Sequence, residues 1–235
     1  MKIAVLDDDP AHNELIAGIL ARAGHEAVLF ERPDAALRDL RRQTFDLLLL
    51  DWNMPGMSGI EVLEQLRQGP APPPVLLITS RAEEADIVQG LGAGADDYVV
   101  KPIQPAVLTA RVAALLRRAF PAPPPAGPED FGPYRHVAGE QGIYLNGQRR
   151  DLTAKELQLA LVLFRNAARA LSRDYLLETV WGHSPDLETR TLDAHLSKLR
   201  TKLELRPEHG FRLVTIYGFG YRLEPTTGLQ GDGAA

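Results

Sequence analysis

The sequence predicts an open parallel α/β domain followed by a smaller α+β domain. The first half contains short, continuous apolar runs separated by helix-length segments, a pattern typical of buried parallel strands. A proline-rich stretch interrupts the chain near its middle, and the second half combines amphipathic helical segments with glycine-containing hairpin patterns. A chain of 235 residues suits one large domain or two ordinary ones, and the prolines favour two.

Four apolar runs in the first half each end in a polar group. The runs cover residues 3–6, 47–50, 75–78 and 98–100. The groups that follow them are Asp7-Asp8-Asp9, Asp51, Thr79 and Lys101. Ligands of open parallel sheets bind beyond the carboxyl ends of the strands. We therefore expect three carboxylates, a hydroxyl and an ammonium to converge on one crevice: Asp7, Asp8, Asp51, Thr79 and Lys101.

Such a cluster has a coherent chemistry. Carboxylates this close push one another towards protonation unless a cation compensates them, and Mg²⁺ prefers oxygen ligands. A carboxylate can also act as a nucleophile and carry an aspartyl-phosphate, with Mg²⁺ and Lys101 placing positive charge on the phosphoryl oxygens. Thr79 can hydrogen-bond another of those oxygens. Asp9, which precedes Pro10 and a helical pattern, is better explained as a helix N-cap.

Three stretches of the first half resemble the receiver domain of two-component systems. They are residues 5–10 (VLDDDP), 51–59 (DWNMPGMSG) and 97–102 (DYVVKP), and the resemblance covers about residues 1–119. It implies a doubly wound, five-stranded, flavodoxin-like parallel sheet. It also implies that Asp51 is the phosphoacceptor, and that the donor is a sensor histidine kinase.

The same resemblance assigns roles to the other strand-end residues. The implied Mg²⁺ ligands are Asp7, Asp8, Asp51 and the backbone carbonyl of Asn53. Thr79 and Lys101 match the phosphate-sensing pair, and Tyr98 matches the aromatic residue whose ring changes orientation on activation. The Lys101-Pro102 bond is expected to be cis, although cis is the minority state of such bonds in general.

The composition excludes several classes of protein. The chain contains no cysteine, which rules out disulfides and cysteine-based metal or redox sites. Only four apolar residues precede Asp7, too few for a signal peptide, and no apolar run approaches transmembrane length. We therefore expect a soluble cytoplasmic protein that does not contact membranes. The net charge is −5 over residues 1–118 and +2 over residues 131–235, which suggests different partners for the two halves.

Residues 120–130 are the predicted linker. They contain five prolines, which cannot join a helix or the interior of a sheet. An extended spacer is a better interpretation than a peptide-recognition motif. The expected domains are therefore residues 1–119 and 131–225, and the glycine-rich residues 226–235 are expected to be a flexible tail.

The second domain is expected to begin with short strands and to continue with three helices. Asn146-Gly147 favours a tight hairpin turn. Thr153 and Glu156 form a capping-box pattern at the start of the first helix. The predicted apolar stripe of that helix consists of Leu157, Leu161 and Phe164. Ser172 can cap a second helix that ends near Trp181.

The third helix, about residues 189–203, is the candidate recognition element. Its predicted buried stripe has spacings of four, three and four, and consists of Leu192, Leu196, Leu199 and Leu203. At 100° per residue, the opposite side carries Arg190, Ala194, Ser197, Lys198 and Thr201. Arg200 and Lys202 flank the stripe. Such a face suits entry into the DNA major groove, but for this helix alone an ordinary solvated amphipathic helix is an equally good interpretation.

The last patterned segment, residues 211–223, is predicted to be a β-hairpin turned by Gly218 and Gly220. Helix, turn, helix and hairpin together constitute a winged helix. Over about residues 131–224 this half resembles the DNA-binding domain of the OmpR/PhoB response regulators. The motifs that match are Leu152-Thr153 with Glu156, residues 190–195 and residues 217–223.

The second resemblance implies a set of DNA contacts. Arg190 and Arg200 are expected to contact phosphates, and Ala194 and Lys198 to face base edges. The full predicted set is Arg190, Ala194, Ser197, Lys198, Arg200, Thr201 and Arg222. His195 is either a phosphate contact or a packed helix residue. Residues 181–188 match a loop that touches RNA polymerase in relatives, with a plain helix connection as the alternative.

Two features depart from the family pattern. Many relatives carry a wing arginine that enters the minor groove where Tyr217 stands here, with Arg212 and Arg222 as uncertain substitutes. Relatives also use charged residues of the fourth receiver helix in an ion-paired dimer, whereas residues 85–94 offer only Asp86. Other candidates for such pairs are Asp96, Asp97, Arg111, Arg117 and Arg118. Because exposed ion pairs contribute little, we expect a weaker or differently held dimer.

The combined pattern predicts a two-component transcriptional regulator and not an enzyme. A sensor histidine kinase would phosphorylate Asp51, and the chain would then form a homodimer and bind promoter DNA. One alternative is a regulator of the same fold that binds DNA without phosphorylation. Another is a phosphatase of the haloacid dehalogenase class, with Asp7-Asp8-Asp9 as its nucleophile motif. That pattern expects Thr or Val at Pro10, and it explains neither Asp51 nor the winged helix.

Overall fold

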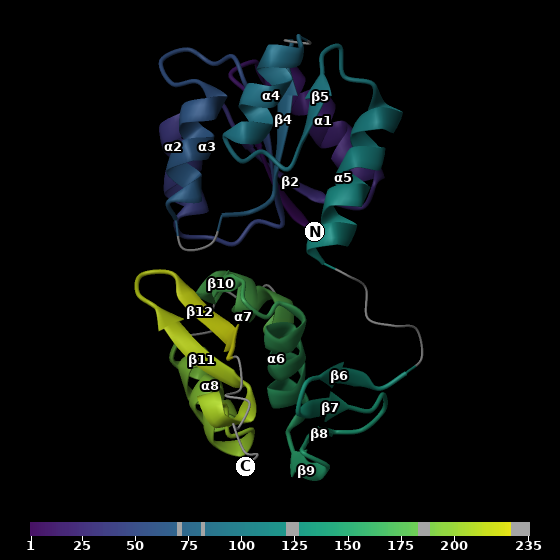
Figure 1. The fold of residues 1–235 in the computed structure, drawn as a ribbon, viewed down its shortest axis with the longest axis vertical. Helices are drawn as coiled ribbons and strands as arrows, with labels where there is room; N and C mark the ends of the chain where they lie inside the picture. The colour runs from purple at the N-terminus through teal and green to yellow at the C-terminus, as the bar shows by residue number, and fades with distance from the viewer. Residues whose placement is uncertain (70–71, 81–82, 121–126, 183–188, 227–235) are drawn as a thin grey trace, which may run out of the picture. The chain divides into compact units, whose positions relative to one another are not determined.

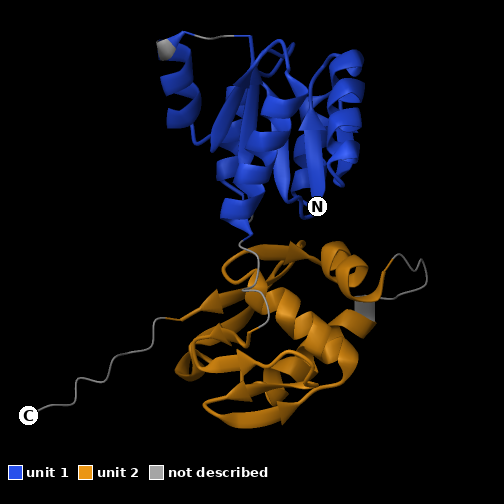
Figure 2. Ribbon diagram, turned by 90° about the vertical axis from the view of Figure 1, so that its right-hand side faces the viewer, with its two compact units in different colours: residues 1–121 blue, residues 122–235 orange. Residues whose placement is uncertain are grey.

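The chain folds into two compact units, residues 1–121 and 122–235 (Figure 2). The computed structural model describes residues 1–69, 72–80, 83–120, 127–182 and 189–226, and the side chains of Glu84, Thr189 and Arg190 fall outside this description. Each unit has its own hydrophobic core. Within the described residues, no helix is both long and apolar enough to cross a membrane.

In its described residues the first unit alternates five parallel strands with five helices (Figure 1). The strands are β1 (Lys2–Leu6), β2 (Glu26–Phe30), β3 (Leu47–Asp51), β4 (Val75–Thr79) and β5 (Asp97–Val100). The helices are α1 (Pro10–Arg22), α2 (Pro33–Leu40), α3 (Gly59–Arg67), α4 (Glu84–Gly92) and α5 (Pro105–Ala119). The strand order is β2-β1-β3-β4-β5, and each neighbouring pair is parallel. This confirms the predicted doubly wound sheet.

Helices cover both faces of this sheet, with α2 and α3 on one side and α1 and α5 on the other (Figure 1). Alternate residues of one strand therefore enter different cores: Leu48 and Leu50 pack with α2 and α3, whereas Leu47 and Leu49 pack with α1 and α5. All four leucines are 0% exposed. Burial on both faces explains why the strands read as unbroken apolar runs.

Side-chain caps begin two helices of the first unit. Asp9 Oδ1 accepts a hydrogen bond from the Ala11 N–H at 2.8 Å, and Pro10 occupies the first helical position of α1. The N-cap interpretation of Asp9 is therefore confirmed. Ser58 and Glu61 form a reciprocal capping box at the start of α3, which begins eight residues after the end of β3.

The described part of the second unit contains three α-helices and two antiparallel sheets. One sheet has the order β6 (Glu129–Phe131), β7 (Tyr134–His136), β8 (Gly142–Leu145), β9 (Gln148–Asp151). The other has the order β10 (Ala170–Ser172), β12 (Gly220–Pro225), β11 (Phe211–Ile216). The helices are α6 (Ala154–Arg165), α7 (Arg173–Trp181) and α8 (Thr189–Lys202). The sequence of three helices and a final hairpin confirms the winged helix.

The core of the second unit confirms one predicted stripe and shows that another is part of a wider apolar surface. The four leucines of the α8 stripe are each 0% exposed: Leu192, Leu196, Leu199 and Leu203. On α6, Leu161 and Phe164 are buried as predicted, and Leu157 is partly buried against the same core. The deepest residues of α6 are Leu159, Ala160 and Leu163. This helix is apolar on several sides because it contacts α7, α8 and β12, so its sequence does not mark a single stripe.

One predicted turn is confirmed and the other is shifted. Asn146 and Gly147 both have positive φ and join β8 to β9, as a tight hairpin turn requires. In the wing, Gly218 turns the chain with a φ of 71°, but Gly220 is the first residue of β12 and pairs with Ile216. Gly220 is glycine for another reason, because a Cβ atom there would overlap the carbonyl oxygen of Leu171.

The first strand of the second unit includes two residues that the sequence places in the linker. Glu129 and Asp130 lie in β6, where Glu129 pairs with His136. The Arg165 guanidinium also holds the Glu129 carboxylate, with nitrogen–oxygen distances of 2.6 and 2.8 Å. The first strand of the second unit therefore begins at Glu129, before residue 131. The remaining linker residues 121–126 and the tail residues 227–235 lie outside the described residues.

The capping box of α6 predicts a pH-dependent stability of the second unit. Glu156 is 2% exposed, and its Oε2 accepts hydrogen bonds from the Thr153 N–H at 2.8 Å and Lys202 Nζ at 2.7 Å. Burial opposes ionisation, but these contacts outweigh it and lower the pKa of Glu156. A carboxylate whose pKa is depressed on folding stabilises the fold above its unfolded pKa. This stabilisation is lost as the pH falls through the folded pKa.

We therefore expect Glu156→Gln to lower the free energy of unfolding of this unit by about 1–3 kcal/mol at neutral pH. The difference should shrink as the pH falls below the ordinary glutamate pKa, and it should vanish once the pH has fallen through the lowered pKa of Glu156 in the folded chain. Urea unfolding at several pH values measures it. The matched control is Glu61→Gln, in the exposed capping box of α3, which should change stability less. An equal effect at both positions would contradict a special contribution from the contact between Lys202 and the buried Glu156 carboxylate.

Candidate functional site

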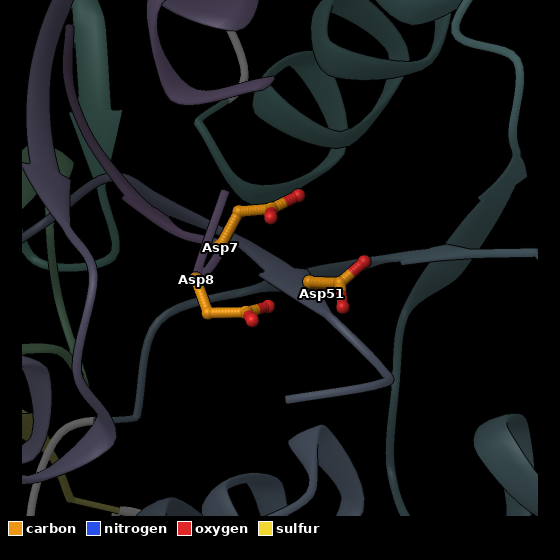
Figure 3. Close-up of side chains that lie close together, drawn as sticks. All are labelled: Asp7, Asp8 and Asp51. Atoms are coloured by element: carbon orange, nitrogen blue, oxygen red, sulfur yellow. The ribbon is translucent and has the colours of Figure 1, made fainter. Parts of the chain in front are cut away.

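The carboxyl ends of four strands bring the predicted residues together. Asp7 follows β1, Asp51 ends β3, Thr79 ends β4 and Lys101 follows β5. The carboxylates of Asp7, Asp8 and Asp51 turn towards the same space, and one oxygen from each lies within 4.8 Å of the others (Figure 3). Asp7, Asp51 and Thr79 are buried, whereas Asp8 is exposed. The predicted convergence is therefore observed for the three carboxylates.

The Lys101 side chain joins this acidic cluster. Its Nζ lies 2.6 Å from Asp51 Oδ1 and 3.0 Å from Asp7 Oδ2. An ammonium has three hydrogens and no lone pair, so it donates to both carboxylates. A single positive charge thus lies between two buried negative charges. The Lys101-Pro102 peptide bond is cis, as predicted.

Burial and charge balance perturb the titration of the cluster. Burial raises the pKa of Asp51 and the charge of Asp7 adds to this rise, although contacts with Lys101 and the Asn53 N–H oppose it. Burial alone would lower the pKa of Lys101, but its hydrogen bonds to Asp51 and Asp7 outweigh burial and raise the pKa. One ammonium faces three carboxylates, which leaves an excess of negative charge. This all-oxygen donor set fits a hard divalent cation.

The loop after β3 orients the Asp51 carboxylate. The Asn53 N–H donates to Asp51 Oδ2 at 2.8 Å, so the two oxygens of Asp51 have different partners. The Asn53 side-chain amide donates to Ser80 Oγ at 3.1 Å, which links this loop to the end of β4. The Trp52 N–H donates to the Ile78 carbonyl at 2.9 Å. The carboxylate is therefore held by the backbone and does not depend on Lys101 alone.

His12 is a residue of this site that the sequence did not reveal. It lies in the first turn of α1, and its ring Nδ1 is 3.1 Å from Lys101 Nζ and 3.4 Å from Asp7 Oδ2. The same atom is 3.5 Å from Asp9 Oδ2. The available signal is spacing: α1 begins at Pro10, three residues after Asp7, so its first turn must lie over the end of β1.

Tyr98 lies on β5, outside the acidic cluster. The Arg111 guanidinium lies 5.5 Å from the centre of its ring and 2.6 Å from Asp97 Oδ1. Asp96 Oδ2 is likewise 2.8 Å from Arg67 Nη2. Two of the acidic residues that the sequence offers for a dimer contact are therefore paired within the unit.

The exposed face of α8 is the second candidate site. The predicted face residues on it are exposed: Ala194, Ser197, Lys198 and Thr201. The four leucines of the same helix are buried. Small and polar groups with one lysine thus form a surface that can enter a DNA groove. The side chain of Arg190 lies outside the described residues.

Arg200 links α8 to the wing. Its Nη2 donates to the Leu213 carbonyl at 3.2 Å and to Thr215 Oγ1 at 3.3 Å, both on β11. The guanidinium also lies 5.8 Å from the centre of the Tyr221 ring. Arg200 therefore has a structural role within the unit, besides the phosphate contact that the sequence predicts.

The wing arginines are also engaged within the unit. Arg222 Nη2 lies 2.5 Å from one oxygen of Glu224, and Arg212 Nη2 lies 2.7 Å from the other. These are the two residues that the sequence offers in place of a minor-groove arginine. Tyr217, at the tip of the hairpin, is fully exposed.

His195 packs inside the second unit. Its Nδ1 lies 2.8 Å from the Thr191 carbonyl oxygen, and its ring meets the Trp181 ring edge-on with centres 5.1 Å apart. Of its two predicted roles, the packed helix residue is the one that these contacts support. Residues 183–188 of the predicted polymerase-contacting loop lie outside the described residues.

Comparisons with known proteins match both units. Residues 3–113 match the response regulator receiver domain, and residues 147–223 match the family described as transcriptional regulatory protein, C terminal. The sensory transduction protein RegX3 of Mycolicibacterium smegmatis is 38% identical over 226 residues, which span 94% of this chain and 98% of that protein. The alkaline phosphatase synthesis transcriptional regulatory protein PhoP of Bacillus subtilis is 37% identical over 231 residues, 95% of this chain and 96% of that protein.

A solved structure aligns over a similar span. The response regulator DrrB, an OmpR/PhoB homologue from Thermotoga maritima, is 32% identical and covers 96% of this chain and 99% of its own, with a TM-score of 0.46. The two family matches lie one in each unit, with the receiver domain first and the C-terminal regulatory domain second.

Proposed function

The chain belongs to the OmpR/PhoB family of two-component response regulators, and on this premise we propose that Asp51 accepts a phosphoryl group from a sensor histidine kinase. The observation that carries the proposal is the position of Lys101 Nζ, 2.6 Å from Asp51 Oδ1 and 3.0 Å from Asp7 Oδ2. Phosphoryl transfer to a carboxylate needs a positioned nucleophile and a fixed positive charge beside it. The matches to a receiver domain and to a transcriptional regulatory domain favour a regulator over a phosphatase.

The transfer is a displacement at phosphorus. A carboxylate oxygen of Asp51 forms a P–O bond with the phosphoryl group of the kinase phosphohistidine. The P–N bond breaks, and its electron pair stays on the imidazole nitrogen of the kinase. The Asn53 N–H and Lys101 hold the Asp51 carboxylate in place during the attack. Lys101 and Thr79, at the ends of adjacent strands, then face the new phosphoryl oxygens.

Mg²⁺ is the cofactor that this site fits. Asp7, Asp8 and Asp51 supply three carboxylate oxygens close enough to share one cation, and the Asn53 backbone carbonyl is the proposed fourth protein ligand. When bound, the ion neutralises negative charge on the phosphoryl oxygens. The excess of carboxylates over ammonium groups supports this assignment, because Lys101 compensates only one of the three.

The phosphoryl group biases a two-state equilibrium in the receiver domain. Thr79, Lys101 and Tyr98 form the path from Asp51 to the surface of α4, β5 and α5. We assign the receiver to residues 1–119, and the winged helix to a span that starts at β6, residues 129–225, with the residues between as linker. Homodimerisation then places two recognition helices on repeated half-sites and raises affinity through multivalency.

Promoter DNA is the partner of the second domain. The exposed side chains of α8 face base edges, and Arg190, Arg200 and Arg222 contact phosphates. Arg200 also hydrogen-bonds the Leu213 carbonyl, and Arg222 also pairs with Glu224, so each must share its guanidinium between these partners and a phosphate. Contact with RNA polymerase through residues 181–188 stays a prediction, because most of that loop lies outside the described residues.

Lys198→Ala is expected to relax base preference at one position of the half-site. Lys198 is exposed at the centre of the α8 face, and a lysine that meets a base edge contributes about 1–3 kcal/mol of discrimination. Sites selected from random DNA by the wild-type chain should bind the variant about 5–150-fold more weakly, while binding to unrelated DNA changes little. Fluorescence anisotropy with both kinds of duplex measures the two effects.

The matched control for Lys198 is Arg135→Ala. Arg135 is an exposed cation on β7, in the other sheet of the same domain, and its removal should leave site preference unchanged. An equal loss on specific and unrelated DNA in Lys198→Ala would assign Lys198 to the phosphates instead. Affinity that does not fall with salt for the wild-type chain would contradict a charged DNA interface altogether.

A regulator that binds DNA without phosphorylation is the second candidate. Asp97 and Asp96 already pair with Arg111 and Arg67 inside the unit, so fewer charges remain for an ion-paired dimer. Equal affinity for the selected site with and without a phosphoryl mimic would favour this alternative.

A further inference from the structure

His12 makes the third contact of the Lys101 ammonium. We propose that His12 is a positioning residue for phosphoryl transfer, in which its ring Nδ1 accepts a hydrogen bond from Lys101 and keeps that ammonium directed at Asp51. This inference rests on the proposed function of Asp51 as phosphoacceptor. It concerns His12, a residue of α1 that does not itself react with the phosphoryl group.

Three side chains lie within hydrogen-bond distance of Lys101 Nζ. The atom lies 2.6 Å from Asp51 Oδ1, 3.0 Å from Asp7 Oδ2 and 3.1 Å from His12 Nδ1. An ammonium can only donate, so in a hydrogen bond between Lys101 and His12 the ring Nδ1 is the acceptor. The same Nδ1 lies farther from the carboxylates, 3.4 Å from Asp7 Oδ2 and 3.5 Å from Asp9 Oδ2.

The lysine needs such a partner because its side chain is long and flexible. Four rotatable bonds connect the ammonium to the backbone, and ordering them costs up to about 2 kcal/mol of rotamer entropy. The contact with Asp51 changes when that carboxylate becomes an acyl phosphate, and Asp7 is a proposed metal ligand. His12 is neither the proposed phosphoacceptor nor a proposed metal ligand, so it is the partner that can hold Lys101 before and after the transfer.

The position of His12 is itself well defined. It lies in the first turn of α1, which Asp9 caps, and the Asp9 N–H donates to Asp7 Oδ1 at 2.9 Å. In the next position, the buried amide of Asn13 donates to the carbonyl oxygens of Asp7 and Phe30 at 2.8 and 3.2 Å. These contacts tie the turn that carries His12 to the end of β1. The imidazole is 37% exposed and can be substituted without opening the core.

The test compares a variant that keeps an acceptor with variants that remove it. His12→Asn places an amide oxygen where Nδ1 lies, whereas His12→Leu and His12→Ala offer none. Purified full-length protein with Mg²⁺ is given acetyl phosphate, and uptake is followed by intact mass spectrometry. In this reaction an Asp51 oxygen bonds to phosphorus, the P–O bond to the acetyl group breaks, and acetate leaves with its electron pair. Loss of one hydrogen bond should slow uptake about 3–10-fold in His12→Leu and His12→Ala, with His12→Asn within about twofold of wild type.

A second readout needs neither phosphate nor metal. In the metal-free protein, the hydrogens on Lys101 Nζ should give a resolved NMR signal in the wild type and in His12→Asn. The signal should broaden in His12→Leu and His12→Ala, because a less restrained ammonium exchanges its hydrogens faster with water. Glu14→Gln is the control on the same helix, since Glu14 is exposed, and it should leave both uptake and signal unchanged.

The outcomes distinguish a failure of the proposed role of His12 from a failure of the assignment of Asp51. Wild-type rates and an unchanged Lys101 signal in His12→Leu and His12→Ala would overturn the role of His12. Slow uptake in His12→Asn as well would also overturn it, because the acceptor would then be irrelevant. If the wild type takes up no phosphate, the assignment of Asp51 fails, and the NMR comparison still decides whether His12 restrains Lys101.

Discussion

Replacing Asp51 with asparagine is expected to abolish covalent phosphate uptake. An asparagine side chain has no carboxylate oxygen with which to form an acyl phosphate, so no slower version of the same reaction remains. The half-buried Lys101 ammonium keeps its contacts with Asp7 and His12, and the variant should therefore fold. Incubation with acetyl phosphate and Mg²⁺, followed by intact mass spectrometry, should show the unmodified mass of Asp51→Asn under conditions in which the wild type gains one phosphoryl group.

The control for this experiment is Asp9→Asn, the same chemical change two residues beyond Asp7. Asp9 caps α1, and asparagine is an equally good N-cap, so uptake should persist. Undiminished uptake by Asp51→Asn would overturn the assignment of the phosphoacceptor. Peptide mapping of the phosphoryl group to Asp7 would place the nucleophile at the end of β1 instead, as in the phosphatase alternative.

The sequence predicted the first unit well because its signals are local. Each central strand is buried on both faces, so runs such as Leu47 to Leu50 mark the strand and the polar residue that follows marks its end. Parallel strands with helical crossovers then bring those ends to one edge of the sheet. The meeting of Asp7 and Asp51 follows from these two facts, without knowledge of any side-chain rotamer.

What the sequence could not reveal depends on contacts between distant segments. In the sequence, His12 is an ordinary residue of a predicted helix. Only the fold shows that Lys101, at the end of β5, lies 3.1 Å from its ring. The sequence does not show that Arg212 is engaged, because only the hairpin register pairs it with Glu224. Arg222 lies two residues before Glu224 on the same strand and contacts the other carboxylate oxygen. Strand β6 has only three residues, and only its pairing with β7 distinguishes it from the linker.

Gly59→Ala is expected to damage both the fold and the site. Gly59 begins α3, and a Cβ atom on it would overlap the carbonyl oxygen of Asp51 and lie 3.0 Å from Trp52 Cα. Neither neighbour can move freely, because Asp51 belongs to β3 and the Gly59 N–H itself donates to the Trp52 carbonyl at 2.9 Å. Backbone displaced in this way typically costs about 1–3 kcal/mol or more. The protection of β3 amides against hydrogen exchange should fall by a corresponding factor of about 5–150.

The same change should slow phosphoryl uptake, because Gly59 packs against the backbone of the proposed nucleophile. A displacement of about 1 Å in a reacting group can reduce a rate by about 100-fold, so a folded Gly59→Ala variant should react much more slowly than the wild type. The matched control is Gly92→Ala at the end of α4, where a Cβ atom meets no neighbour within 4 Å. That variant should match or exceed the wild-type stability by up to about 1 kcal/mol, since alanine favours a helix over glycine. Equal stabilities and equal uptake rates for the two variants would show that the close approach of Gly59 to Asp51 positions neither the strand nor the carboxylate.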